Sequence, residues 1–168
     1  MEEIINKVKQ SGLIQIDLED LRPQGERVFI DIAPQLFMGL ALREKDFRTF
    51  IQTHDWSQYQ GKHVAIACSA DAIIPTWAYM LISSQLSGKA STIVYGSLAD
   101  LEKHLFEQVI QEMDLAPYDD AKIVIKGCSK ESVPLEAYVS LTNRLRPLAR
   151  SLFFGEPCST VPIYKKAK

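Results

Sequence analysis

The three cysteines of the sequence stand in similar surroundings, and their thiolates could bind a metal or act as nucleophiles. Each is followed directly by serine and, a few residues later, by proline. The three are Cys68, Cys128 and Cys158. Each also comes just after a short apolar segment that predicts a buried strand. If these strands are parallel, all three thiols lie at one edge of a sheet, where ligand sites form in such folds.

Three thiolates from separate strands suit Zn²⁺ or iron, an iron–sulfur cluster included, because soft sulfur ligands favour these metals. The cysteines lie far apart in the sequence and form no CxxC pair, so no short zinc motif is present. We therefore predict a metal site made by Cys68, Cys128 and Cys158. Its fourth ligand is open: water, substrate, a partner's residue, or a side chain of this chain. By type, the candidates are His54, Ser69, Asp71 and Glu156. His63 begins its strand, which places it at the opposite edge.

Two other functions remain open. Cys68 could be the nucleophile of a thiol enzyme or a sulfur carrier. Alternatively, the cysteines are buried structural residues in a non-catalytic interaction domain, since cysteine often only fills space. The sequence contains no GxSxG, Walker A, GxGxxG or HExxH motif, and no arginine stands six positions after a cysteine as in a cysteine phosphatase. Whether the protein is an enzyme is left open.

Strand and helix patterns alternate along most of the chain. Amphipathic or apolar helices are expected at 2–10, 44–54, 75–86, 98–113 and 134–146. Strands are expected at 13–18, 27–32, 63–67, 92–95, 122–125 and 151–154. The order β-α-β-α-β-α-β in the C-terminal two thirds predicts parallel strands with right-handed crossovers. We expect an α/β fold: one three-layer domain over residues 1–168, with the first two strands added to an edge as antiparallel strands.

Two further features have ordinary explanations that we prefer. Gly96-Ser97 could bind an anion at a helix N-terminus, but a plain turn with a serine cap is expected. Arg144, Arg146 and Arg150 cluster late in the last helix, where a solvated basic face near a helix C-terminus is the usual interpretation.

Composition excludes several classes of protein. With 168 residues, 46% of them hydrophobic, and a net charge of −2, the chain has no strong basic field for nucleic acid. No apolar run reaches the roughly 18 residues of a membrane span. The N-terminus lacks the features of a signal peptide, so we expect a cytoplasmic protein with reduced cysteines. A homodimer is compatible with so small a domain.

Four segments of the chain resemble one known family. They are residues 54–57, 68–79, 125–129 and 155–162, with sequences HDWS, CSADAIIPTWAY, IKGCS and GEPCSTVP. They are similar to domain-of-unknown-function family 2480, uncharacterised bacterial proteins found mainly in Bacteroidetes. The resemblance covers nearly the whole chain and implies a cytoplasmic single-domain protein without an assigned catalytic residue. It also implies iron–sulfur assembly proteins as partners, because such genes lie near those of cluster assembly.

Overall fold

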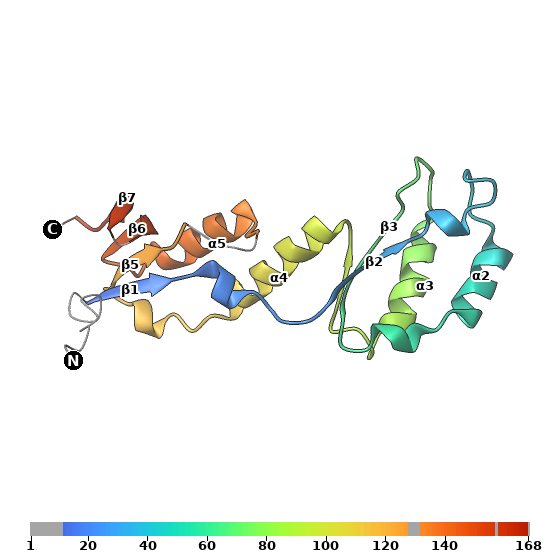
Figure 1. Cartoon of the computed structure of the whole chain (residues 1–168), viewed down its shortest axis with the longest axis horizontal. Coiled ribbons are helices and arrows are strands. Elements are labelled where there is room, and N and C mark those ends of the chain that lie inside the picture. The colour runs from blue at the N-terminus through green and yellow to red at the C-terminus, as the bar shows by residue number, and fades with distance from the viewer. Residues whose placement is uncertain (1–11, 128–131, 157, 168) are drawn as a thin grey trace, which may run out of the picture. The chain divides into compact units, whose positions relative to one another are not determined.

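The computed structural model describes residues 12–127, 132–156 and 158–167, and the chain packs into two compact units (Figure 1). Unit 1 comprises Met1–Pro23 and Leu105–Lys168, and unit 2 comprises Gln24–His104. The chain passes between the units after Pro23 and again within helix α4 (Leu98–Glu112). That residues 1–168 form a single domain stays a prediction.

Unit 2 is built on a parallel three-stranded sheet. Its strands are β2 (Arg27–Asp31), β3 (His63–Ala67) and β4 (Thr92–Tyr95), in the order β2-β3-β4. Helices α2 (Glu44–Thr53) and α3 (Thr76–Leu86) contribute to one apolar core with this sheet. Four of the five residues of β3 are buried, as expected for a central strand paired on both sides.

Unit 1 is built on a mixed four-stranded sheet in the order β1-β5-β6-β7. Its strands are β1 (Leu13–Ile16), β5 (Lys122–Ile125), β6 (Ser151–Glu156) and β7 (Ser159–Lys165). β1, β5 and β6 are parallel, and β7 pairs antiparallel to β6. Helix α5 (Leu135–Leu145) and the C-terminal part of α4 supply the apolar residues that pack on it. Short 3-10 helices complete the chain: η1 (Leu18–Leu21), η2 (Ala33–Gln35), η3 (Trp56–Tyr59) and η4 (Ala116–Tyr118).

The α/β class and its parallel strands are confirmed, but the expected antiparallel edge strands are wrong. β1 pairs parallel to β5, and β2 pairs parallel to β3, in two separate sheets. β3 and β5 are interior strands, so the backbone groups along both of their edges require hydrogen-bond partners. β2 provides the partners along one edge of β3, and β1 does so along one edge of β5. The expected helix at 2–10 lies outside the described residues. In the part of the chain that the structure describes, no helix combines the length and apolar character that crossing a membrane requires.

The two units repeat one β-α-β arrangement. Helices α3 and α5 are both 11 residues long, and they start 59 positions apart, at residues 76 and 135. The strands before them start at 63 and 122, and the strands after them at 92 and 151, with the same spacing. Gly96 and Gly155, equally spaced, both have positive φ, 134° and 122°. Each unit also adds one N-terminal strand, β2 or β1, beside its first β-α-β strand.

Candidate functional site

The cysteines are distributed over both units. Cys68 directly follows β3 in unit 2 and is half-buried against its core, whereas Cys158 is exposed at the turn between β6 and β7 in unit 1. Cys128 lies outside the described residues. Among the residues that the structure describes, no group of three or more His, Cys, Asp or Glu could hold a metal ion. The three-cysteine site therefore stays a prediction.

Two of the candidate fourth ligands already have polar partners. Ser69 donates from its backbone N–H to Asp31 Oδ1 at 2.9 Å and from its hydroxyl to Asp31 Oδ2 at 2.5 Å. His54 Nε2 is 2.9 Å from the hydroxyl of Tyr59, and the ring stacks among aromatic side chains. Asp71 is exposed in the loop after β3, and Glu156 is half-buried at the end of β6.

Asp31, at the carboxyl end of β2, holds the loop that begins with Cys68-Ser69. It also accepts the backbone N–H of Ala33 at 2.9 Å. Burial raises the pKa of Asp31, but hydrogen bonds from Ser69 and Ala33 outweigh it, and the net pKa lies below its ordinary value. Sequence analysis missed this residue. The available signal was an acidic side chain at a strand end just before a turn, where aspartate caps free N–H groups.

Asp17 occupies the equivalent place in unit 1. It accepts the backbone N–H of Glu19 at 3.0 Å and binds the ammonium of Lys126, after β5, at 2.9 Å. The hydrogen bond and charge of Asp17 raise the pKa of Lys126. In both units, an aspartate at the end of the N-terminal strand thus anchors the residues that follow the neighbouring strand.

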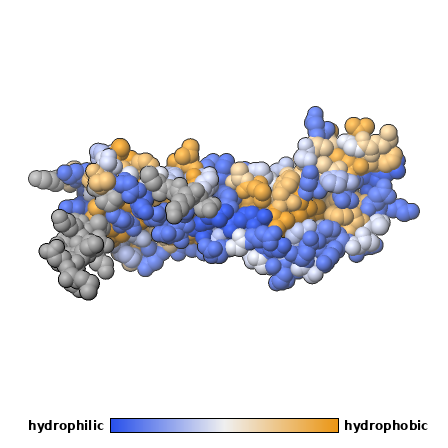
Figure 2. Space-filling model, in the orientation of Figure 1, coloured by the Kyte–Doolittle hydropathy of each residue, from blue (hydrophilic) through white to orange (hydrophobic). Residues whose placement is uncertain are grey.

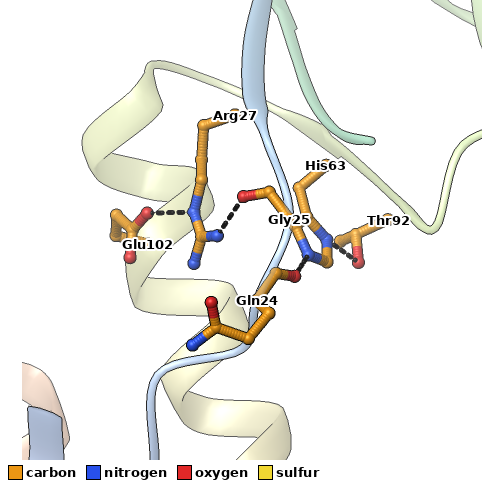
Figure 3. Close-up of polar contacts among 6 residues, drawn as sticks. All are labelled: Gln24, Gly25, Arg27, His63, Thr92 and Glu102. Atoms are coloured by element: carbon orange, nitrogen blue, oxygen red, sulfur yellow. Dashed lines mark hydrogen bonds and ion pairs between the residues drawn. The ribbon is translucent and has the colours of Figure 1, made fainter. Parts of the chain in front are cut away.

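The opposite, amino-terminal edge of the sheet in unit 2 carries a polar network (Figure 3). His63 Nε2 donates to the carbonyl of Gln24 at 2.7 Å, and its Nδ1 lies 3.0 Å from Thr92 Oγ1. Because a carbonyl only accepts, Nε2 must carry a proton. The expectation that His63 lies away from the cysteine edge is confirmed, since β3 starts with His63 and ends one residue before Cys68.

Arg27 is the charged member of this network. Its Nε donates to Glu102 Oε1 at 2.6 Å, and its Nη1 donates to the carbonyl of Gly25 at 2.5 Å. Nη2 is buried and has no hydrogen-bond partner among the described residues. The side chains of Arg27 and Glu102 are only 11% and 18% exposed, so this ion pair lies largely out of water.

A groove of about 830 Å³ runs beside α5 in unit 1, and we call it the α5 groove. It lies at the carboxyl end of β5, where the chain enters the helix. Its described walls consist of apolar side chains and of side chains that carry a hydroxyl or an amide group. None of the described lining residues is Asp, Glu, Lys, Arg or His. The described lining residues are Ile125, Gly127, Ser132, Val133, Leu135, Tyr138, Val139, Thr142, Asn143, Phe154 and Ile163.

The α5 groove contains an edge-to-face aromatic pair. The rings of Tyr138 and Phe154 have centroids 5.8 Å apart and an interplanar angle of 82°. Gly127 allows this packing, because a Cβ there would lie 2.6 Å from Phe154 Cζ. Leu135 and Val139 on α5 are 78% and 63% exposed, so the apolar rim of the groove faces solvent.

A second groove of about 520 Å³ lies beside α3 in unit 2, and we call it the α3 groove. Its lining residues are Ile66, Tyr79, Met80, Ser83, Ser84, Ser87, Ile93, Val94 and Tyr95. Tyr79 and Tyr95 form an edge-to-face pair with centroids 5.1 Å apart and an interplanar angle of 84°. Burial raises the pKa of Tyr79, as do, to a smaller extent, nearby Tyr95 and Cys68.

The ordinary explanation of Gly96-Ser97 as a capped turn agrees with the structure. Ser97 donates from its backbone N–H and its hydroxyl to Asp100 at 2.8 and 2.7 Å, as a helix cap does. These hydrogen bonds lower the pKa of Asp100. The expected solvated face of three arginines late in the last helix is wrong, because α5 ends at Leu145. Arg144 donates to the carbonyl of Ile110, Arg146 lies over the ring of Tyr164, and Arg150 pairs with Asp120.

A family model described as "protein of unknown function (DUF2480)" matches residues 2–166, nearly the whole chain. The chain belongs to this family. The resemblance seen in the four cysteine- and tryptophan-containing segments is thereby confirmed, and the family assigns no residue a role. No match was found among curated proteins or among solved structures.

Proposed function

We propose that this member of the DUF2480 family binds a small, neutral, largely apolar molecule in the α5 groove. The observation that supports it is a groove with an aromatic pair and no charged side chain in its described lining, at the carboxyl ends of the parallel strands β5 and β6. Its volume of about 830 Å³ lies in the range typical of small-molecule sites. Ligands of α/β folds commonly bind at this edge.

The lining determines the chemistry of the ligand. Tyr138 and Phe154 offer ring faces and edges to a flat apolar group, which aromatic residues prefer to contact in offset or edge-to-face geometry. Thr142 donates its hydroxyl proton to the carbonyl of Tyr138 at 2.7 Å, so toward a ligand it acts as an acceptor. A charged ligand would lose hydration without gaining an opposite charge from the described lining residues, which favours a neutral molecule.

The surface supports binding from solution. Figure 2 shows hydrophobic side chains at the surface of unit 1, and Leu135, Val139 and Ile163 are at least half exposed. Contiguous exposed apolar side chains in a soluble fold commonly indicate a binding surface.

The proposal can be tested with N-phenyl-1-naphthylamine, a neutral probe with a naphthyl and a phenyl group whose fluorescence rises in apolar surroundings. We expect saturable binding that Val139→Glu weakens at least tenfold, because a carboxylate would enter the apolar rim. Ile73→Glu is the matched control, since Ile73 is 94% exposed and lies outside both grooves. Binding that is absent in the wild type, or unchanged in Val139→Glu, would contradict the proposal.

A metal site is the second candidate, and one observation favours it. β5 and β6 are parallel neighbours, with Ile125 paired to Phe154. Cys128 follows Ile125 by three residues, and Cys158 follows Phe154 by four. Two of the three predicted ligands therefore follow neighbouring parallel strands of unit 1 in the sequence, and Cys68 is the third predicted ligand. Zinc or iron, an iron–sulfur cluster included, suits such ligands, and iron–sulfur assembly proteins would be the partners.

The metal proposal predicts bound metal in protein purified anaerobically without a chelator or a metal-affinity tag. Zinc without acid-labile sulfide would indicate a mononuclear site, and iron with sulfide would indicate a cluster. Replacing Cys68, Cys128 or Cys158 singly with serine should remove the metal, while far-ultraviolet circular dichroism verifies the fold. Metal-free wild-type protein would refute this candidate and leave the α5 groove proposal untouched.

A further inference from the structure

We infer that the α3 groove of unit 2 is a second site for the same class of ligand, so that one chain takes two molecules. This inference rests on the function proposed for the α5 groove. It comes from the repeated β-α-β arrangement, which places the two grooves at equivalent positions of the two units. Two copies of one module that keep the same surface chemistry are expected to keep the same binding chemistry.

Equivalent residues line the two grooves at the spacing of 59 positions. Five pairs show this: Ile66 and Ile125, Tyr79 and Tyr138, Met80 and Val139, Ser83 and Thr142, Tyr95 and Phe154. Each groove thus has an apolar strand residue, an edge-to-face aromatic pair, an exposed aliphatic side chain on the helix and a hydroxyl one turn later. The described lining of the α3 groove also contains no Asp, Glu, Lys, Arg or His.

The backbone that shapes the grooves is equally alike. Pro75 and Pro134 precede the two helices with nearly equal ψ, 137° and 141°. The carbonyl of each proline accepts the N–H of the third residue on, Ala78 or Ala137, at 3.0 Å in both units. Helix α3 therefore begins after β3 in the same way as α5 begins after β5. As a result, the aromatic and aliphatic residues of the two helices occupy equivalent positions in the two units.

One difference between the units sets the expected order of affinity. In unit 1, β7 pairs with β6, and its Ile163 forms part of the groove. In unit 2, the chain leaves β4 through Gly96 into α4, and no strand of the described residues pairs with the outer edge of β4. The α3 groove is accordingly smaller and lacks that aliphatic wall. We expect it to bind the probe about tenfold more weakly than the α5 groove.

The experiment counts bound N-phenyl-1-naphthylamine by equilibrium dialysis of the full chain. Wild type and the Ile73→Glu control should bind two equivalents, one tighter than the other. Met80→Glu should lose the weaker equivalent, Val139→Glu the tighter one, and the double variant both. Met80 and Val139 are 65% and 63% exposed and hold equivalent helix positions, so the two substitutions are matched.

A second measurement does not depend on altering the α3 groove. With methyl-labelled methionine, the Met80 resonance of the Val139→Glu protein should shift as the probe is added. Met38, which is 77% exposed outside the grooves, should not shift. The second site is refuted if the wild type binds one equivalent, Val139→Glu binds none, and the Met80 resonance does not shift. The proposed function of the α5 groove would still stand in that case. If the wild type binds no probe, both fail.

Discussion

Replacing Arg27 with methionine should lower the free energy of unfolding by about 2–3 kcal/mol, because a largely buried ion pair with Glu102 would be lost. The reverse substitution, Glu102→Met, should cost about as much. The Nε of Arg27 and Oε1 of Glu102 are 2.6 Å apart, and the side chains are 11% and 18% exposed. Water therefore screens this pair less than a surface pair.

The size of the coupling follows from these numbers. Two unit charges about 4 Å apart attract each other by about 4 kcal/mol at an effective dielectric constant of about 20. Desolvation of both groups offsets part of that attraction, which leaves an expected coupling of about 2 kcal/mol. The double variant should therefore be about as stable as either single variant, because the coupling offsets most of the cost of the second substitution.

Urea unfolding followed by tryptophan fluorescence is the assay. Both tryptophans, Trp56 and Trp77, lie in unit 2, so the signal reports on the unit that contains the ion pair. The control cycle uses Glu44 and Arg48, an i,i+4 pair on α2 that is 62% and 54% exposed. That pair should couple by only about 0.3–0.5 kcal/mol. A coupling below about 0.5 kcal/mol for Arg27 and Glu102 would refute the reasoning.

Three further outcomes are expected. Gly25→Ala should destabilise unit 2 by about 1–3 kcal/mol in the same urea assay, because φ is 119° and a Cβ would lie 2.9 Å from His63 Nε2; an unchanged midpoint would contradict this. Asp31→Asn should cost about 1 kcal/mol at neutral pH, because an amide oxygen accepts hydrogen bonds from Ala33 and Ser69 more weakly than a carboxylate does. The folded-state pKa of Asp31 lies below its ordinary value of 3.8. The loss of stability in Asp31→Asn should therefore persist above pH 3.8 and shrink as pH falls through the folded-state pKa. Unfolding curves taken across pH measure this dependence. Exposed Cys158 should be alkylated faster than half-buried Cys68 by mass spectrometry, and faster reaction of Cys68 would instead favour the thiol-enzyme alternative.

Much of the secondary structure could be predicted because its signals are local. The expected strand at 63–67 is β3, and the helix expected at 75–86 is α3, which begins one residue later. Apolar runs of five residues and a proline at a helix start depend only on neighbouring residues. β7 was missed because Pro162 interrupts its pattern. The strand tolerates proline because it pairs only with β6 and so lies at the edge of the sheet.

The candidate site was predicted only in part. The positions of Cys68 and Cys158 after strands follow from sequence, and the structure agrees with them. Asp31 was missed because its partner, Ser69, is 38 residues away and only strand pairing brings them together. The grooves were missed for the same reason. Tyr79 and Tyr95 meet across a helix and a strand, and periodicity along the chain does not show which side chains meet.

By itself the sequence determined the α/β class, the order of helices and strands from β1 to β6, the cysteine surroundings and the family. Those properties depend on residue type and short-range spacing. The tertiary structure alone decided that β1 and β2 join different sheets and that two units repeat one module. It also decided that each unit carries a groove with an aromatic pair and no charged side chain among its described lining residues. These features arise from hydrogen bonds and packing between residues far apart in the chain, whose energies depend on the fold as a whole.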